Sequence, residues 1–146
     1  MTSIIVGCDH AAYVLKEKVK AYLVKNGVDV EDVGAHSEDS IDYSDIGIKV
    51  ASMVSAGKFE RGILLCGTGI GMSMVANRFA RVRAALCTDL FSAMMSRRHN
   101  NANILVLGGR VTGEGLALEI VQSWLETPFE GERHQSRIDK FDRIGE

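Results

Sequence analysis

A thiol followed directly by a glycine-rich turn is the part of this sequence best suited to chemistry. Apolar residues 63–65 lead into Cys66, and the loop Gly-Thr-Gly-Ile-Gly occupies positions 67–71, after which a helical pattern begins. Glycines let backbone N–H groups point inward, and the helix N-terminus adds partial positive charge, so this order of elements forms an anion site. Positive charge also favours the thiolate form of a cysteine. The stretch therefore offers a base or nucleophile beside a cradle for negative charge.

Three interpretations of this loop compete. A dinucleotide fingerprint needs G-x-G-x-x-G, and Met72 stands where the third glycine belongs, although Asp89 lies about 20 residues further on, as that motif requires. A low-molecular-weight phosphatase needs an arginine six residues after its thiol, and apolar residues stand there after all three cysteines. The third interpretation, a thiol acting as a base beside an oxyanion-binding loop, requires only residues that are present.

Histidines and arginines elsewhere add candidates for binding and proton transfer. His10 and His99 are expected to lie where a strand or a helix ends facing the site. Arg133 and Arg137 are four residues apart and share one helical face. With His134 they could clamp a phosphate, because arginine presents a planar fork of donors. An ordinary solvated face is equally consistent with this spacing.

The remaining cysteines and polar residues have simpler interpretations. Cys8 and Cys87 each end or follow an apolar run and are expected to be small core residues. His36 is expected to be exposed in a polar loop, and Tyr43 could simply pack over the end of the sheet. Three cysteines without a short Cys-x-x-Cys spacing argue against a disulfide framework or a structural zinc site. They indicate a reducing compartment, for which we expect the cytoplasm.

Composition limits the classes of partner. The chain has 146 residues, of which 46% are hydrophobic and 25% charged, as expected for one globular domain covering residues 1–146. A net charge of −2 does not indicate a nucleic-acid or membrane-surface binder. No apolar run approaches the ~18 residues of a membrane span, and the first residues run straight into a strand pattern without a signal peptide.

Short apolar runs alternate with helical periodicity along the whole chain. Strands are predicted at residues 4–6, 28–33, 63–66, 83–87 and 104–107, and the second of these alternates apolar and acidic residues as an edge strand does. Helices are predicted between them and after the fifth strand, with Asp89 as the N-cap of the fourth. A final helix over 134–145 carries Ile138, Phe141 and Ile144, whose apolar face could pack on the domain or on a second subunit.

This alternation predicts an α/β fold with a five-stranded parallel sheet and helices on both faces, because parallel strands need crossover connections. Ligands bind outside the carboxyl ends of the strands in such sheets. The thiol loop, the residues after the first and fourth strands and Gly108-Gly109-Arg110 should therefore meet at one edge. We expect the functional histidines and arginines at the same edge.

The ordered set of motifs resembles the type B ribose-5-phosphate isomerases, in the wider group that includes galactose-6-phosphate isomerase subunits. The resemblance covers essentially the whole chain. Six blocks of residues carry it: Gly7-Cys8-Asp9-His10-Ala11-Ala12 with Leu15-Lys16, Asp42-Tyr43, residues 66–71, Ser96-Arg97-Arg98-His99-Asn100 with Asn103, Gly108-Gly109-Arg110, and residues 129–137. It implies a three-layer Rossmann-like domain, a metal-free and cofactor-free isomerase of ribose 5-phosphate and ribulose 5-phosphate, and a homodimer, or a tetramer, whose subunits share the active site.

The family's pattern also implies roles for individual residues. Cys66 is the base that moves a proton between carbons 1 and 2, Thr68 helps proton transfer at the sugar oxygens, and His99 with Asp9 opens the furanose ring. The phosphate is held by His10, Arg133 and Arg137. The sugar oxygens and the enediolate are bound by Tyr43, Asn100, Arg110 and the amides of Gly67, Gly69, Ile70 and Gly71.

Two alternatives to a ribose 5-phosphate isomerase stay open at this point. A six-carbon substrate, galactose 6-phosphate or allose 6-phosphate, depends on the loop 35–41 and on the bulk around Tyr43. A non-catalytic phosphosugar-binding module would bind its ligand without proton exchange. The presence of Cys66, Thr68 and His99 argues for an enzyme.

Overall fold

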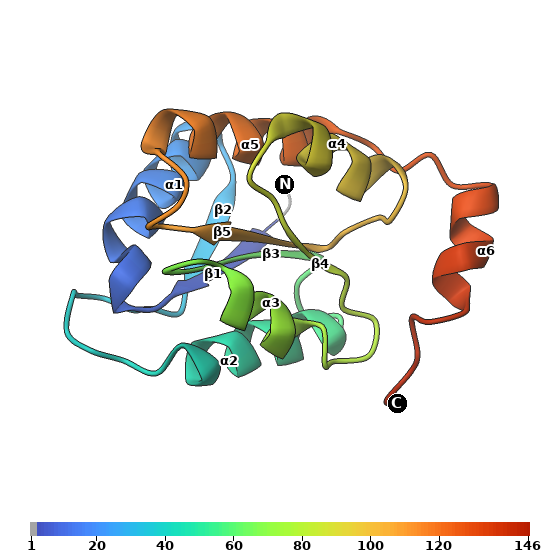
Figure 1. Ribbon diagram of the computed structural model, residues 1–146, viewed down its shortest axis with the longest axis horizontal. Helices are drawn as coiled ribbons and strands as arrows, with labels where there is room; N and C mark the ends of the chain where they lie inside the picture. The colour runs from blue at the N-terminus through green and yellow to red at the C-terminus, as the bar shows by residue number, and fades with distance from the viewer. Residues whose placement is uncertain (1–2) are drawn as a thin grey trace.

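Strands and helices alternate along the computed structural model, which describes residues 3–146 (Figure 1). The strands are β1 (Ser3–Cys8), β2 (Asp29–Asp32), β3 (Arg61–Cys66), β4 (Ala84–Leu86) and β5 (Ile104–Gly108). The helices are α1 (Tyr13–Lys25), α2 (Tyr43–Ser55), α3 (Ile70–Ala76), α4 (Leu90–Arg98), α5 (Glu114–Glu126) and α6 (Arg133–Asp139), with a 3₁₀ turn, η1 (His10–Ala12), before α1. No helix within 3–146 is both long and apolar enough to span a membrane.

The five strands form one parallel sheet in the order β2-β1-β3-β5-β4. Helices α1, α4 and α5 lie on one face and α2 and α3 on the other, so the predicted three-layer α/β fold is confirmed (Figure 1). β2 is an edge strand, as its alternating sequence predicted. Because every strand runs the same way, all carboxyl ends meet at one edge of the sheet, and the helices end at the opposite, amino edge.

Two apolar layers bury the sheet. On one face Trp124 of α5 is fully buried with Val19 and Leu23 of α1, and on the other Met72 of α3 packs with Val50 of α2. The central strands β1, β3 and β5 are nearly continuous buried apolar runs, as expected for a parallel sheet that is covered twice.

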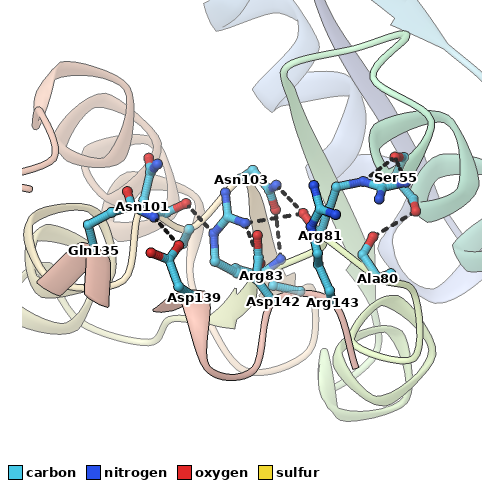
Figure 2. Close-up of polar contacts among 12 residues, drawn as sticks. Ser55, Ala80, Arg81, Arg83, Asn101, Asn103, Gln135, Asp139, Asp142 and Arg143 are labelled. Carbon is cyan, nitrogen blue, oxygen red and sulfur yellow. Dashed lines mark hydrogen bonds and ion pairs between the residues drawn. The ribbon is translucent and has the colours of Figure 1, made fainter. Parts of the chain in front are cut away.

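The final helix is shorter than its periodicity predicted. α6 ends at Asp139, and Phe141 and Ile144 lie beyond it with 45% and 73% of their surface exposed. The segment after α6 is instead tied to the edge of the sheet (Figure 2). Arg83 pairs with Asp142 at 2.6 Å, and the backbone N–H of Arg81 donates to the Asp142 carbonyl at 2.6 Å. These contacts draw the chain away from a helical path, so the expected helix over 134–145 is wrong in its second half.

A buried ion pair fixes the segment that follows β2. The Lys16 ammonium is fully buried and lies 2.6 Å from the carboxylate of Asp32, which is itself 7% exposed. The other oxygen of that carboxylate accepts the Gly34 N–H at 2.9 Å. Burial alone would raise the pKa of Asp32, but the bonds from Lys16 and Gly34 hold that pKa below its ordinary value. Since Gly34 and Ala35 pair with the backbone of Cys8, this ion pair braces the end of β1.

The substitution Asp32→Asn should destabilise the fold by about 3 kcal/mol at pH 7, because it removes the buried carboxylate from Lys16 and leaves only the partly exposed Glu17 as its ion-pair partner. The pKa of Asp32 is lowered by folding, so its contribution is present above the unfolded value near 3.9 and is lost as the pH falls further. The difference between variant and wild type in urea unfolding should therefore shrink below about pH 4. Asp29→Asn, at the exposed start of the same strand, is the control. Equal stability of Asp32→Asn and wild type at pH 7 would contradict this assignment.

Candidate active site

The turn after β3 brings backbone N–H groups to the Cys66 sulfur. Gly69, at φ +83°, is the N-cap of α3, and its N–H donates to Cys66 Sγ at 3.2 Å. The left-handed φ favours glycine here, and a Cβ at this position would also lie 2.5 Å from Leu86. Cys66 is 5% exposed, so its sulfur lies just under the surface. An N–H aimed at sulfur from a helix start favours negative charge there.

The turn after β5, residues 108–110, packs against the thiol loop, residues 66–71. Gly109 N–H donates to the Cys66 carbonyl at 2.8 Å, and Arg110 N–H donates to the Gly67 carbonyl at 2.9 Å. A Cβ on Gly108 would lie 2.6 Å from the Thr68 carbonyl oxygen, so only glycine allows this approach. The Arg110 guanidinium lies beside Gly67. Backbone hydrogen bonds thus join the two turns, and they place Arg110 beside the thiol loop.

The end of β1 contributes a carboxylate and an imidazole. Asp9 is 7% exposed, its N–H donates to the Leu65 carbonyl at 3.2 Å, and its Oδ1 is buried without a hydrogen-bond partner within residues 3–146. The next residue, His10, accepts the Ile41 N–H through Nδ1 at 3.1 Å. Nδ1 also lies 3.3 Å from the Ile41 carbonyl oxygen, so the backbone of Ile41 positions the ring in either tautomer. An unpartnered buried carboxylate oxygen at a sheet edge is a feature that a bound hydroxyl would satisfy.

Tyr43 covers the start of α3. Its ring lies so close to Gly71 that a Cβ there would meet it at 2.6 Å, and the tyrosine is 38% exposed. The structure therefore brings ten of the predicted site residues to the carboxyl edge of the sheet. They are Asp9, His10, Tyr43, Cys66, Gly67, Thr68, Gly69, Ile70, Gly71 and Arg110.

Four other predicted site residues lie at the opposite edge. α4 runs back along the sheet, so His99 and Asn100 follow its C-terminus and lie just before the start of β5. Arg133 and Arg137 are exposed on α6, which Figure 1 shows apart from the layers, on the side away from the β3–α3 turn. The expectation that histidines and arginines share one edge with the thiol therefore holds for His10 and is wrong within a single chain for His99, Arg133 and Arg137, because α4 and α5 each return the chain to the amino edge.

The buried side chain of Arg97 fixes the loop that carries His99 and Asn100. Arg97 is 5% exposed and donates through Nη1 to the Ala102 carbonyl at 2.7 Å and to Asn101 Oδ1 at 2.9 Å. Its guanidinium lies 6.0 Å from the centre of the Trp124 ring. Burial, with the neighbouring Arg61 and Arg83, lowers the pKa of Arg97 to about 10, so it remains charged at neutral pH. These bonds fix the loop that carries His99 and Asn100.

His99 does not stand alone on this edge. Its ring stacks on that of His134, with centroids 4.4 Å apart and planes 13° apart. Glu130 lies beside both, with Oε1 at 3.9 Å from His99 Nε2 and 3.4 Å from His134 Nε2. Sequence patterns did not predict this grouping, because it joins the end of α4 to the loop before α6 through loop geometry alone.

The three cysteines differ in environment, and a labelling experiment can test the difference. Burial raises the pKa of both Cys8 and Cys87 to about 11, which supports their interpretation as core residues. Iodoacetamide added to the native protein at pH 7.5 should therefore label Cys66 first, with the other two reacting only on unfolding. Peptide mass spectrometry after a time course measures this order. Equal labelling of all three in the folded protein would contradict it.

Nearly the whole chain is similar to proteins of one known family. The family model described as Ribose/Galactose Isomerase matches residues 4–141. Ribose-5-phosphate isomerase B of Escherichia coli K12 is 44% identical over 99% of this chain and 97% of its own length. D-erythrulose-4-phosphate isomerase of Pectobacterium atrosepticum is also 44% identical, over 96% of this chain and 93% of its own. The crystal structure of a ribose 5-phosphate isomerase from Thermotoga maritima superposes with a TM-score of 0.93, at 52% identity over 97% of each chain. The chain belongs to the ribose/galactose isomerase family.

Proposed function

We propose that this protein is an aldose–ketose isomerase that interconverts ribose 5-phosphate and ribulose 5-phosphate through an enediolate. One observation carries the proposal: the Cys66 sulfur receives an N–H from a glycine loop at the start of a helix, where it can act as a base beside donors for negative charge. Relatives named as ribose-5-phosphate isomerases support the substrate.

In the proposed mechanism, Cys66 takes the proton from carbon 2 of the open-chain aldose and returns it to carbon 1. The negative charge that develops on the sugar oxygens is stabilised by N–H groups of residues 67–71, which are already oriented when the substrate binds. Thr68, whose Oγ1 lies 3.2 Å from the Ile70 nitrogen, assists proton transfer at those oxygens. A base and fixed donors suffice for this chemistry, so we propose no metal and no organic cofactor.

Ring opening and phosphate binding require the second group of residues. We assign His99, with Asp9, to opening the furanose ring, and His10, Arg133 and Arg137 to the phosphate. Tyr43, Asn100 and Arg110 are assigned to the sugar oxygens. Since His99, Asn100, Arg133 and Arg137 lie at the amino edge and the thiol at the carboxyl edge, one chain cannot place them around one sugar.

A homodimer with shared sites would reconcile this separation. We propose that the amino edge of one subunit supplies its histidine and arginines to the thiol loop of the other. Ile70 and Met74 on α3 are 51% and 67% exposed beside the thiol loop, and a second copy would cover them. A cavity of about 460 Å³ beside Asn100, lined by Phe141 and Ile144, offers a further apolar surface for contact. Residues 1–146 would act as one domain in this assembly.

Substrate length is a second question within the same activity. The relative named for a four-carbon substrate is as similar to this chain as the one named for ribose 5-phosphate, so identity alone does not fix the length. We assign the choice between ribose 5-phosphate and longer or shorter sugar phosphates to the loop 35–41 and Tyr43, since Ile41 contacts His10 at the phosphate end. We further propose a reducing compartment, the cytoplasm, because the base must stay a free thiol.

The experiment measures exchange of the transferred sugar proton with solvent. Purified protein with EDTA is incubated with ribose 5-phosphate in deuterated water, and ketose formation is followed together with deuterium in the sugar. We expect rapid ketose formation with label uptake. Cys66→Ala should lower kcat by about 10²-fold or more while the sugar phosphate still binds, because only the base is lost.

Cys87→Ala is the matched control, since Cys87 is buried just after β4, two strands away from β3, and lies outside the proposed machinery. It should keep wild-type turnover. Full turnover of Cys66→Ala would refute the base assignment. Substrate binding by wild type without ketose or label would instead indicate a binding module, and turnover of six-carbon phosphates only would change the substrate.

A further inference from the structure

Three metal-binding side chains meet at the amino edge of the sheet. They are His99 at the end of α4, Glu130 in the segment before α6, and His134 in the first turn of α6; their ligand atoms all lie within 4.8 Å of one another. We propose that His99, Glu130 and His134 form a binding site for one divalent transition-metal ion of the zinc class. An ion bound there inhibits the isomerase.

The least exposed member of the group has a nitrogen without a partner. His134 is 6% exposed, and its Nε2 is buried with no hydrogen bond among residues 3–146. Glu130 Oε1 lies 3.4 Å from this nitrogen but outside hydrogen-bonding geometry. A buried polar nitrogen that makes no bond costs free energy. An ion seated between the imidazole and the carboxylate would use that nitrogen.

The donor set favours one class of ion. Two imidazoles and one carboxylate are the protein ligands of many open zinc sites, in which a fourth position is left for water or substrate. Imidazole suits zinc, copper, nickel and cobalt, whereas magnesium and calcium prefer sites built of oxygen. Because two of the three donors are imidazole nitrogens, we expect Zn²⁺ but not Mg²⁺ to bind.

Binding requires the exposed His99 ring to turn out of its stack on His134. The two rings are stacked 13° from parallel, and a metal ion must lie in the plane of each imidazole at about 2.0 Å from nitrogen. The side chains of His99 and Glu130 are 43% and 49% exposed and can turn, while His134 stays fixed. The backbone is held already, because Glu130 N–H donates to the Arg98 carbonyl at 3.0 Å.

Inhibition follows from the identity of one ligand, and this part rests on the proposed function. If His99 opens the sugar ring, a metal ion on its Nε2 removes the nitrogen that would exchange the proton. The ion is then an inhibitor that EDTA reverses, rather than a cofactor. Sugar phosphate and ion compete for His99, so added substrate should weaken the inhibition.

The test measures binding separately from activity. Protein freed of metal with EDTA and then desalted is titrated with ZnCl₂ by calorimetry, in the absence of sugar. We expect one ion per chain in wild type, and an affinity lower by about tenfold or more in Glu130→Gln and in His134→Asn. Glu130 is half exposed, so its variant keeps the fold if the buried His134 variant does not. Glu132→Gln and His36→Asn are matched controls at exposed positions and should bind as wild type does.

A thiolate is also a zinc ligand, so Cys66→Ser is the variant that separates binding at the thiol from binding at the proposed site. Retention of the calorimetric site in Cys66→Ser, with its loss in Glu130→Gln, supports the proposal. Loss in Cys66→Ser with full retention in Glu130→Gln would overturn it. Zinc binding by a protein without isomerase activity would refute the proposed function and leave the site standing, whereas an active enzyme that zinc does not inhibit would refute the inhibitory role.

Discussion

The parallel direction of all five strands is the constraint on which the rest of this molecule depends. Each crossover helix must return to the amino edge before the next strand can begin, so every loop after a strand lies at one edge and every loop after a helix lies at the other. Cys66 belongs to the first kind of loop and His99 to the second. The residues that we assign to the proposed reaction are thereby divided between two edges of the sheet, and for this reason we propose that a second copy completes each site.

Each half of the site rests on a buried charge. At the carboxyl edge, the ion pair of Lys16 with Asp32 fixes the segment that pairs with Cys8, next to Asp9 and His10. At the amino edge, Arg97 packs over Trp124 and binds the loop that follows His99. Removing the partner of a buried charge is costly, so these groups hold their loops more firmly than exposed pairs could. Rigid loops are a condition for donors that are oriented before the substrate arrives.

Sequence patterns predicted the elements whose position depends on burying an apolar face. All five strands and helices α1 to α5 were predicted from their periodicity, and Asp89 caps α4 as predicted, with its side chain accepting the Ser92 N–H. Patterns failed where contacts distant in sequence decide the path. The tail after Asp139 follows Arg81 and Arg83 rather than its own helical spacing, and the stacking of His99 on His134 depends on two loops. The rule that ligands bind at the carboxyl edge located the thiol loop, Asp9 and His10, but not His99, whose place at the amino edge follows from the α4 crossover.

Subunit complementation tests the central claim that two chains build each active site. Cys66→Ala chains and His99→Asn chains are prepared separately, mixed in equal amounts and allowed to exchange subunits. Neither variant alone should be active. Random exchange makes half of the dimers hybrid, and each hybrid has one intact site of two, so the mixture should recover about one quarter of wild-type activity. No recovery, with hybrid dimers demonstrated by mass spectrometry, would show that each site is built within a single chain and would contradict the account.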